Sequence, residues 1–305
     1  MKRICEIFNN LKSNRRKILS VASAADAEVL TAVRGAYDAG ISDAILLGGA
    51  DDIRRAAESA GVDISPFEIV SASDETEAAG KAMGLVADGK ADMAMKGLLP
   101  TPVFLKALFD PRYGLRREDG IISALPFFEI PFLDRFLFIT DPGFIPAPDL
   151  DTKVKMINNA VPILRALGTE KPNVAVLCAT ETVNDKMPAA ADAQKLVRMN
   201  EDGRIGDCTV VGPISLDLAI SVASAEHKGF RHPAAGKADL LLAPSIESAN
   251  IFYKALTCFC DFKLAGLITG ARKPVVMTSR ADSPETKLNT IAVAAYLAGG
   301  ATGGQ

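Results

Sequence analysis

The sequence is poor in the residues and runs that mark several large protein classes. It has two histidines and five scattered cysteines in 305 residues. No apolar run reaches the roughly 18 residues that span a bilayer, and polar residues interrupt the basic N-terminal segment too early for a secretory signal. We therefore expect a cytoplasmic protein with reduced thiols and no membrane partner. Cys258 and Cys260 lie in an apolar run, which predicts that they belong to the core.

An excess of positive charge is also missing. The chain has 34 Lys and Arg residues against 37 Asp and Glu residues, a net charge of −3. Without a basic cluster and interleaved aromatic residues, this balance does not indicate a nucleic-acid partner. Hydrophobic residues make up 49% of the chain and charged residues 23%, which is typical of a globular protein with one or two domains at this length.

Several catalytic motifs do not occur. The chain has no GxSxG, no HExxH and no GxGxxG after a strand. A metal site of the kind used by decarboxylating dehydrogenases needs several acids on one sheet edge, and the spacing of Asp141, Glu181 and Asp217 does not establish one. His227 and His232 lie near a helix end, where histidine is more often a capping or surface residue. We expect no metal and no tightly bound cofactor.

What the sequence does contain is regular alternation of strands and helices. Short apolar strands and amphipathic helices alternate over residues 18–97 and again over residues 149–278. This pattern predicts an α/β fold of two three-layer α/β/α domains with mostly parallel sheets. Residues 141–149 hold three prolines and a glycine, which favours a linker, so we place a domain boundary at 147/148.

Residues 274–295 combine a strand, a polar turn and a helix. Ser283 is a good N-cap residue and Pro284 suits the first helical position. The start of a helix carries unpaired N–H groups and partial positive charge, which favours an anion. Arg280 and Lys287 add full charges, and Ser279 adds a hydroxyl at the carboxyl end of the strand, where open α/β sheets bind ligands. The alternative is an ordinary strand–helix connection whose polar residues only cap and solvate.

A second group of candidates follows the strand over residues 91–95. Lys96 comes directly after that strand, and a short helix over residues 101–109 carries Thr101 and Lys106. Cations and hydroxyls at the carboxyl ends of strands suit phosphate or phosphorylated ligands, because charge-assisted hydrogen bonds contribute about 1.5–3 kcal/mol each. A solvated loop lysine is the alternative for Lys96.

Six segments together carry a family resemblance. They are MKGLLPT (95–101), PDLDTKVKMINNA (148–160), NVAVLCATETVNDKMP (173–188), VVGPISLDLAIS (210–221), ADLLLAPSIESANIFYKAL (238–256) and PVVMTSRADSPETKL (274–288). Over residues 17–298 the sequence resembles the phosphate butyryltransferases, close relatives of the phosphate acetyltransferases. The resemblance implies an isopropylmalate dehydrogenase-like fold with an interdomain cleft. It also implies that the C-terminal segment returns to the first domain, so that residues 1–147 with 267–305 form one domain and 148–266 the other.

The reaction implied by the resemblance is acyl-CoA + phosphate ⇌ acyl phosphate + CoA. Butyryl-CoA is the expected acyl donor, coenzyme A is substrate and product, and both substrates are held in a ternary complex of a homo-oligomeric enzyme. Three alternatives stay open. They are a phosphate acetyltransferase acting on acetyl-CoA, a catalytically silent CoA- or acyl-phosphate-binding protein, and an NAD-dependent decarboxylating dehydrogenase of the same fold.

The resemblance also assigns roles to residues. Ser279 matches the active-site serine of the family and Arg280 matches the adjacent phosphate-binding arginine. In the acetyltransferases a catalytic aspartate lies seven residues after that serine, whereas this chain has Thr286 there. Asp282 and Glu285 are the local substitutes, and we expect Asp282 to be the base. Lys106 aligns with an arginine of the acetyl branch. The residues expected to bind substrate are Lys96, Thr101, Lys106, Glu285 and Lys287.

Overall fold

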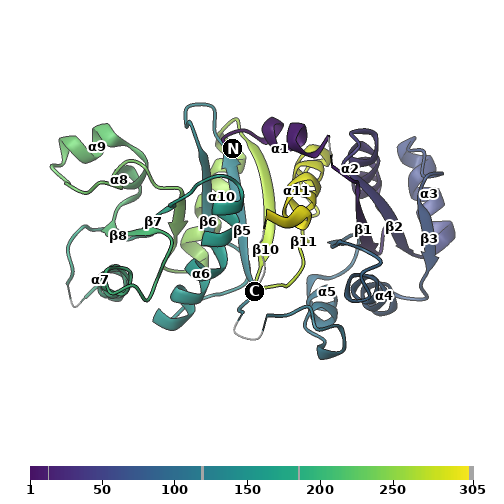
Figure 1. Ribbon diagram of the computed structural model, residues 1–305, viewed down its shortest axis with the longest axis horizontal. Helices are drawn as coiled ribbons and strands as arrows, with labels where there is room; N and C mark the ends of the chain where they lie inside the picture. Colours follow the sequence, from purple (N-terminus) through teal and green to yellow (C-terminus); the bar gives the residue numbers. More distant parts are fainter. Residues whose placement is uncertain (13, 118–119, 185, 302–305) are drawn as a thin grey trace. The chain divides into compact units, whose positions relative to one another are not determined.

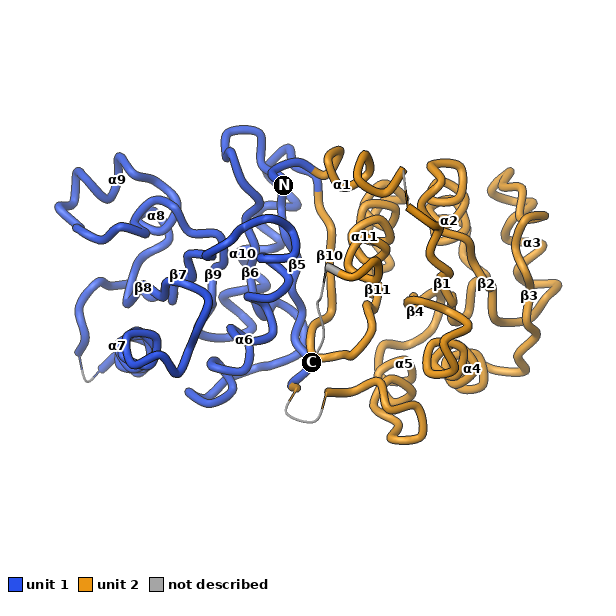
Figure 2. The backbone as a smooth tube through the Cα atoms, in the orientation of Figure 1, with its two compact units in different colours: residues 1–3, 121–263 blue, residues 4–120, 264–305 orange. Residues whose placement is uncertain are grey.

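The computed structural model describes residues 1–12, 14–117, 120–184 and 186–301, which pack into two compact units (Figure 2). Unit 2 comprises residues 4–120 and 264–305, and unit 1 comprises residues 1–3 and 121–263. Both units are α/β structures with mostly parallel strands, as the sequence predicts. None of the helices in the described part of the chain combines the length and apolar character needed to cross a membrane.

Unit 2 contains a sheet with the strand order β3-β2-β1-β4-β11-β10. Its elements are α1 (Ile4–Leu11), β1 (Lys17–Ala22), α2 (Ala27–Asp38), β2 (Ser42–Gly48), α3 (Ala50–Ala60), β3 (Glu68–Ser71), α4 (Glu75–Ala87), β4 (Met93–Lys96), α5 (Thr101–Leu108), η1 (Pro111–Tyr113), β10 (Lys263–Thr269), β11 (Val275–Val276), α11 (Pro284–Tyr296) and η2 (Leu297–Ala301). The pairs among β1, β2, β3, β4 and β11 are parallel, and β10 runs antiparallel to β11.

Helices cover both faces of this sheet. α2 packs on α3 and α11, and α1 packs on α11, all on one face, whereas α4 and α5 pack together on the other (Figure 1). The buried strands explain the arrangement, since all four residues of β4 are buried and apolar side chains from both faces of β1 enter the core. Helix α2, which connects β1 to β2, and helix α4, which connects β3 to β4, lie on opposite faces of the sheet. The direction of the crossovers therefore reverses between the neighbouring strands β1 and β4. Open α/β sheets bind ligands at the carboxyl side of such a point.

Unit 1 has the strand order β5-β6-β9-β7-β8, in which β5 and β6 are antiparallel and the remaining pairs are parallel. Its elements are β5 (Ser123–Glu129), β6 (Phe136–Thr140), α6 (Leu150–Ala166), β7 (Asn173–Leu177), α7 (Pro188–Glu201), β8 (Thr209–Ile214), α8 (Leu216–Ile220), α9 (Val222–His227), β9 (Leu240–Leu242) and α10 (Ile246–Phe259). Helix α6 packs on α7, and α8 packs on α9 and β7.

The compact units divide the chain at 3/4, 120/121 and 263/264, whereas the sequence prediction divides it at 147/148 and 266/267. The difference over residues 121–147 has a physical basis. Strand β6 pairs with β9, which ties it to unit 1. The proline-rich segment after β6 is also held there, because the buried Asp141 carboxylate accepts backbone N–H groups from Gly143 and Phe144, and Ile246 donates to the Pro146 carbonyl at 2.9 Å.

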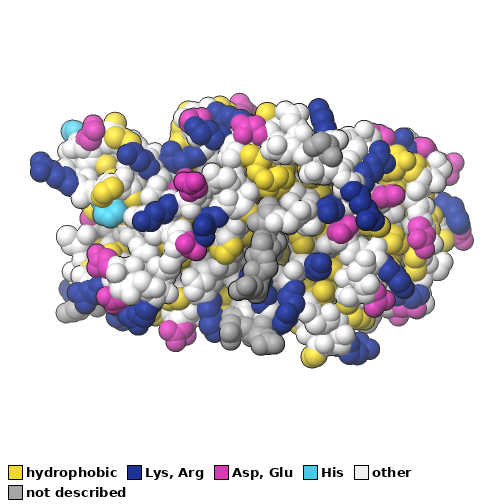
Figure 3. Space-filling model, viewed as in Figure 1, with side chains coloured by type: hydrophobic (Ala, Val, Ile, Leu, Met, Phe, Trp, Pro, Cys, Tyr) yellow, Lys and Arg dark blue, Asp and Glu magenta, His cyan; other side chains and the backbone are white. Residues whose placement is uncertain are grey.

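The prediction that Cys258 and Cys260 belong to the core is wrong, because both are exposed at the end of α10. Phe259 between them is also exposed. An apolar run in the sequence therefore does not distinguish a buried helix face from an uncovered one. On the face of the molecule drawn in Figure 3, basic and acidic side chains are interspersed, in keeping with the near balance of charges.

Candidate functional site

The candidate site of unit 2 lies where three neighbouring parallel strands end. Ala22 at the end of β1 is in register with Lys96 at the end of β4, and Met95 is in register with Val276 of β11. The segments that follow these strands therefore leave the sheet at one edge. They lead to the starts of α2, α5 and α11, whose N–H groups favour an anion. The predicted strand, turn and helix of residues 274–295 are confirmed, with α11 beginning at Pro284.

Gly97 joins the segments after β1 and β4 without space for a side chain. Its N–H donates to the Ala22 carbonyl at 2.8 Å, and the Leu98 N–H donates to the Ser23 carbonyl at 2.7 Å. A β-carbon on Gly97 would lie 2.7 Å from the Ala22 oxygen and would also collide with the Ser23 carbonyl. Only glycine lets the two backbones approach so closely. The close approach fixes the loop that begins at Lys96.

Lys96 is not a solvated loop lysine, since only 6% of the residue is exposed. Its Nζ donates to the carbonyls of Gly97 and Leu99 at 3.2 and 3.1 Å. A buried ammonium is costly without partners, and two neutral carbonyls offset the loss of water less well than a carboxylate or phosphate would. Lys96 is thus a buried cation at the carboxyl edge of the sheet.

The charges around Lys96 have mixed signs. Burial lowers the pKa of Lys96 below the ordinary lysine value, the positive charge of Arg280 lowers it further, and that of Lys287 adds to the effect. The negative charge of Asp26 acts in the opposite direction. The effects of Arg280 and Lys287 on Lys96 place the three predicted cations close enough together that an anionic ligand between them would be favoured.

Ser279 and Asp282 are brought together in one turn before α11. The Ser279 N–H donates to Asp282 Oδ2 at 2.7 Å, and the Asp282 N–H donates to the Ser279 carbonyl at 3.2 Å. Ser279 Oγ accepts from the Ala281 N–H at 3.3 Å, so its hydroxyl hydrogen can be donated elsewhere. Ser279 and Arg280 are exposed. The turn can therefore present a hydroxyl, a guanidinium and a carboxylate within four residues.

Thr286 occupies the position where the resemblance leads one to expect a carboxylate. Its N–H donates to Ser283 Oγ at 3.2 Å, and its own Oγ1 lies 3.3 Å from that oxygen. Thr286 therefore takes part in capping α11. Glu285 lies beside it in the first turn and is exposed.

The two candidates on α5 differ in position. Thr101 is the first residue of α5, two residues after the Leu99 carbonyl that accepts from Lys96. Lys106 lies exposed in the last turn, and its positive charge contributes to lowering the pKa of Asp110. Thr101 thus lies at the start of the helix, close in the chain to Lys96. Lys106 lies at the other end of α5, where its charge acts on Asp110.

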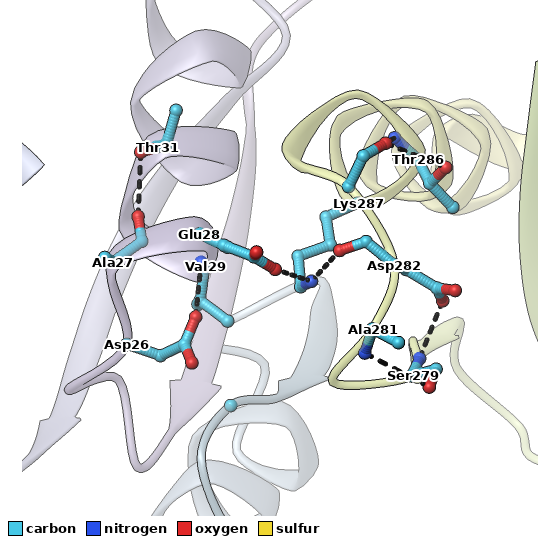
Figure 4. Close-up of polar contacts among 12 residues, drawn as sticks. Asp26, Ala27, Glu28, Val29, Thr31, Ser279, Ala281, Asp282, Thr286 and Lys287 are labelled. Atoms are coloured by element: carbon cyan, nitrogen blue, oxygen red, sulfur yellow. Dashed lines mark hydrogen bonds and ion pairs between the residues drawn. The ribbon is translucent and has the colours of Figure 1, made fainter.

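The residues that sequence reasoning missed are Asp26 and Glu28 at the start of α2. Asp26 caps the helix, accepting from the Val29 N–H at 2.8 Å, and Glu28 binds the buried ammonium of Lys287 at 2.7 Å (Figure 4). Their signal in the sequence is an N-cap aspartate followed by a first-turn glutamate just after the first strand. No group of three or more His, Cys, Asp or Glu side chains able to hold a metal occurs within residues 1–12, 14–117, 120–184 and 186–301.

Comparison with known proteins gives consistent matches. Residues 75–295 match the family model described as phosphate acetyl/butaryl transferase. The phosphate butyryltransferase of Clostridium acetobutylicum is 46% identical over 96% of this chain and 97% of its own length. The phosphate acetyltransferase of Thermotoga maritima is 41% identical over 92% of this chain and 95% of its own. The crystal structure of a branched-chain phosphotransacylase from Enterococcus faecalis superposes with a TM-score of 0.83 at 31% identity, covering 92% of this chain and 99% of that one.

Proposed function

Because the chain belongs to the phosphate acetyl/butyryl transferase family, we propose that it interconverts acyl-CoA plus phosphate and acyl phosphate plus CoA. The observation that carries the proposal is the buried ammonium of Lys96 beside the charge of Arg280 at the carboxyl edge of the unit 2 sheet. A dianion such as phosphate, or the acyl phosphate made from it, supplies the countercharge that these two cations require.

Each residue of the turn has a role in this proposal. In the direction of acyl-CoA synthesis, the CoA thiol loses its proton to the Asp282 carboxylate, because a free thiol with a pKa near ~8.5 is mostly protonated at neutral pH. The thiolate attacks the carbonyl carbon of the acyl phosphate, and the Ser279 hydroxyl donates to the oxyanion that forms. The intermediate then expels phosphate, whose charge Arg280 and Lys96 stabilise. Both substrates are held in one ternary complex, which replaces a bimolecular encounter with a positioned reaction.

We further propose that Thr101, at the start of α5, binds substrate oxygens and that Glu285 and Lys106 contact substrate at the margins of the site. The favoured acyl group is butyryl, because the Clostridium acetobutylicum relative at 46% identity is a phosphate butyryltransferase. The protein acts in the cytoplasm as a homo-oligomer. A methylene group contributes only about 1–3 kcal/mol to discrimination, so neighbouring chain lengths should also react.

The test of the proposed function is the release of CoA thiol from acyl-CoA. We expect thiol release from butyryl-CoA that depends on added phosphate, and slower release from acetyl-, propionyl- and isobutyryl-CoA at equal concentration. Acetyl-CoA as the best substrate would establish the acetyltransferase alternative. Tight CoA binding without turnover of any of the four would establish the silent binding protein instead.

The lowered pKa of Lys96 predicts an alkaline limit on phosphate binding. A cation whose pKa is lowered loses its proton at a lower pH than the ordinary lysine value of about 10.4, so kcat/KM for phosphate should fall as pH rises toward that lowered value. The Lys96→Arg variant keeps its positive charge between pH 7 and 10. Its kcat/KM for phosphate should therefore not show the decline caused by deprotonation of Lys96, and any decline that remains would be due to other groups. An identical alkaline decline in both proteins would show that Lys96 does not titrate there.

A further inference from the structure

The ammonium of Lys287 is held by a residue from a distant part of the chain. Lys287 lies in the first turns of α11, and its side chain is 3% exposed. Its Nζ donates to Oε2 of Glu28 at 2.7 Å, and Glu28 lies in the first turn of α2, which packs on α11. Removing the half-exposed Glu28 carboxylate would leave this buried ammonium without the partner that compensates its charge, so the contact helps to fix where the Lys287 side chain points.

The same ammonium also binds the turn that carries the candidate catalytic residues. Lys287 Nζ donates to the backbone carbonyl of Asp282, and Figure 4 shows it between Glu28 of α2 and that carbonyl. Asp282 in turn holds the Ser279 N–H through Oδ2. A chain of polar contacts therefore runs from Glu28 through Lys287 and Asp282 to Ser279, within unit 2.

The charged groups around this series of polar contacts give Glu28 a second, electrostatic role. Lys287 and Arg280 both act on Lys96 as like charges. Lys287 has a carboxylate partner in Glu28, whereas the acceptors that contact the Lys96 ammonium are the neutral carbonyls of Gly97 and Leu99. The ammonium of Lys287, which the sequence suggested as a substrate ligand, is in contact with two protein groups, the Glu28 carboxylate and the Asp282 carbonyl.

We propose that Glu28 is a positioning residue for the transfer reaction: it orients Lys287, and Lys287 anchors the Asp282 carbonyl and so the turn that presents Ser279 and Arg280. The inference rests on the proposed function for its kinetic consequence. Misplacement of reacting groups by about 1 Å costs up to 10²-fold in rate, so loosening this turn should reduce turnover although Glu28 itself touches no substrate.

The experiment compares four variants of the full chain: Glu28→Gln, Lys287→Met, the double variant, and Glu75→Gln as control. Glu75 is an exposed acid in the first turn of α4, so its substitution reproduces the loss of a helix-start charge without reaching Lys287. Initial rates are measured while phosphate and butyryl-CoA are varied separately. Hydrogen exchange is measured for residues 277–287, because it reports on the turn whether or not the protein is active.

We expect Glu28→Gln to lower kcat/KM for phosphate about 10-fold or more, to change KM for butyryl-CoA little, and to speed exchange in residues 277–287. The double variant should be no worse than Lys287→Met, because both residues act through one contact. Glu75→Gln should resemble the wild type. Unchanged exchange and kinetics in Glu28→Gln, or additive losses in the double variant, would overturn the inference. A wild type without phosphate-dependent thiol release would refute the proposed function alone, since the exchange comparison would still decide whether Glu28 holds the turn.

Discussion

Replacing Arg280 with alanine should lower kcat/KM for phosphate about 10- to 100-fold. The guanidinium is exposed at the turn before α11 and acts electrostatically on the buried Lys96. Its loss removes a charge-assisted, two-pronged contact to phosphate worth about 1.5–3 kcal/mol, and each 1.4 kcal/mol corresponds to tenfold. Steady-state kinetics with phosphate varied at saturating butyryl-CoA measure the effect.

Two further variants make the Arg280 result specific. Arg280→Lys keeps the charge but not the planar fork, so it should recover part of the loss. Arg54→Ala removes an exposed arginine on α3 of the same unit, whose partner is Asp51, and should leave the kinetics unchanged. Removing Arg280 also removes a like charge near Lys96, so the pKa of Lys96 should rise and the alkaline limit on phosphate use should move upward. If Arg280→Ala kept wild-type kinetics, the assignment of the site to this turn would be wrong.

The features of the site that the sequence predicted correctly are those determined by residues close to one another in the sequence. Helix α11 begins at Pro284 because Ser283 caps it and Pro284 suits its first position, and both signals lie within a few residues of each other. Strand β4 ends at Lys96, one residue beyond the predicted end of the strand at residue 95. Parallel strands then bring the strand ends to one edge, which is why the charge of Arg280 acts on Lys96 although the two residues are far apart in the chain.

The parts that the sequence did not predict depend on packing between distant segments. The partner of Lys287 is Glu28, 259 positions away, and no local pattern links them. The burial of Lys96 likewise results from the close contact of Gly97 with the segment after β1. The sequence pattern around a lysine at a strand end is the same whether the following loop buries that lysine or leaves it exposed, so the pattern does not predict its burial. Periodicity therefore located the edge of the sheet but not the contacts of its charged side chains.

The division of the chain shows the same limit. A segment rich in proline and glycine is typical of a linker, and this composition placed the predicted boundary at 147/148. In the structure Asp141 satisfies several backbone N–H groups of that segment, and Asn250 of α10 donates to the Pro142 carbonyl at 2.9 Å. Composition indicates that a segment cannot form a regular helix or strand. Whether the segment is held by its surroundings depends on hydrogen bonds that composition does not specify.

Gly97→Ala should reduce both stability and activity, because a β-carbon there meets backbone atoms that cannot move aside. The added methyl would collide with the Ser23 carbonyl and lie 2.7 Å from the Ala22 oxygen. Forced expansion of a packed region costs about 1–3 kcal/mol, so the midpoint of thermal unfolding should fall. The displaced loop also carries the Gly97 and Leu99 carbonyls that hold Lys96, so kcat/KM for phosphate should fall about 10-fold or more.

Gly84 provides the matched control for this prediction. It lies inside α4 of the same unit, and a β-carbon there would make an ordinary 3.6 Å contact with Tyr113. Gly84→Ala should therefore raise stability by about 0.5–1 kcal/mol, since alanine favours a helix interior more than glycine does, and should leave the kinetics unchanged. Opposite shifts in unfolding temperature for the two glycine-to-alanine changes, with a kinetic loss in Gly97→Ala alone, would show that the close approach of the two loops holds Lys96 in place. Equal behaviour of the two variants would contradict it.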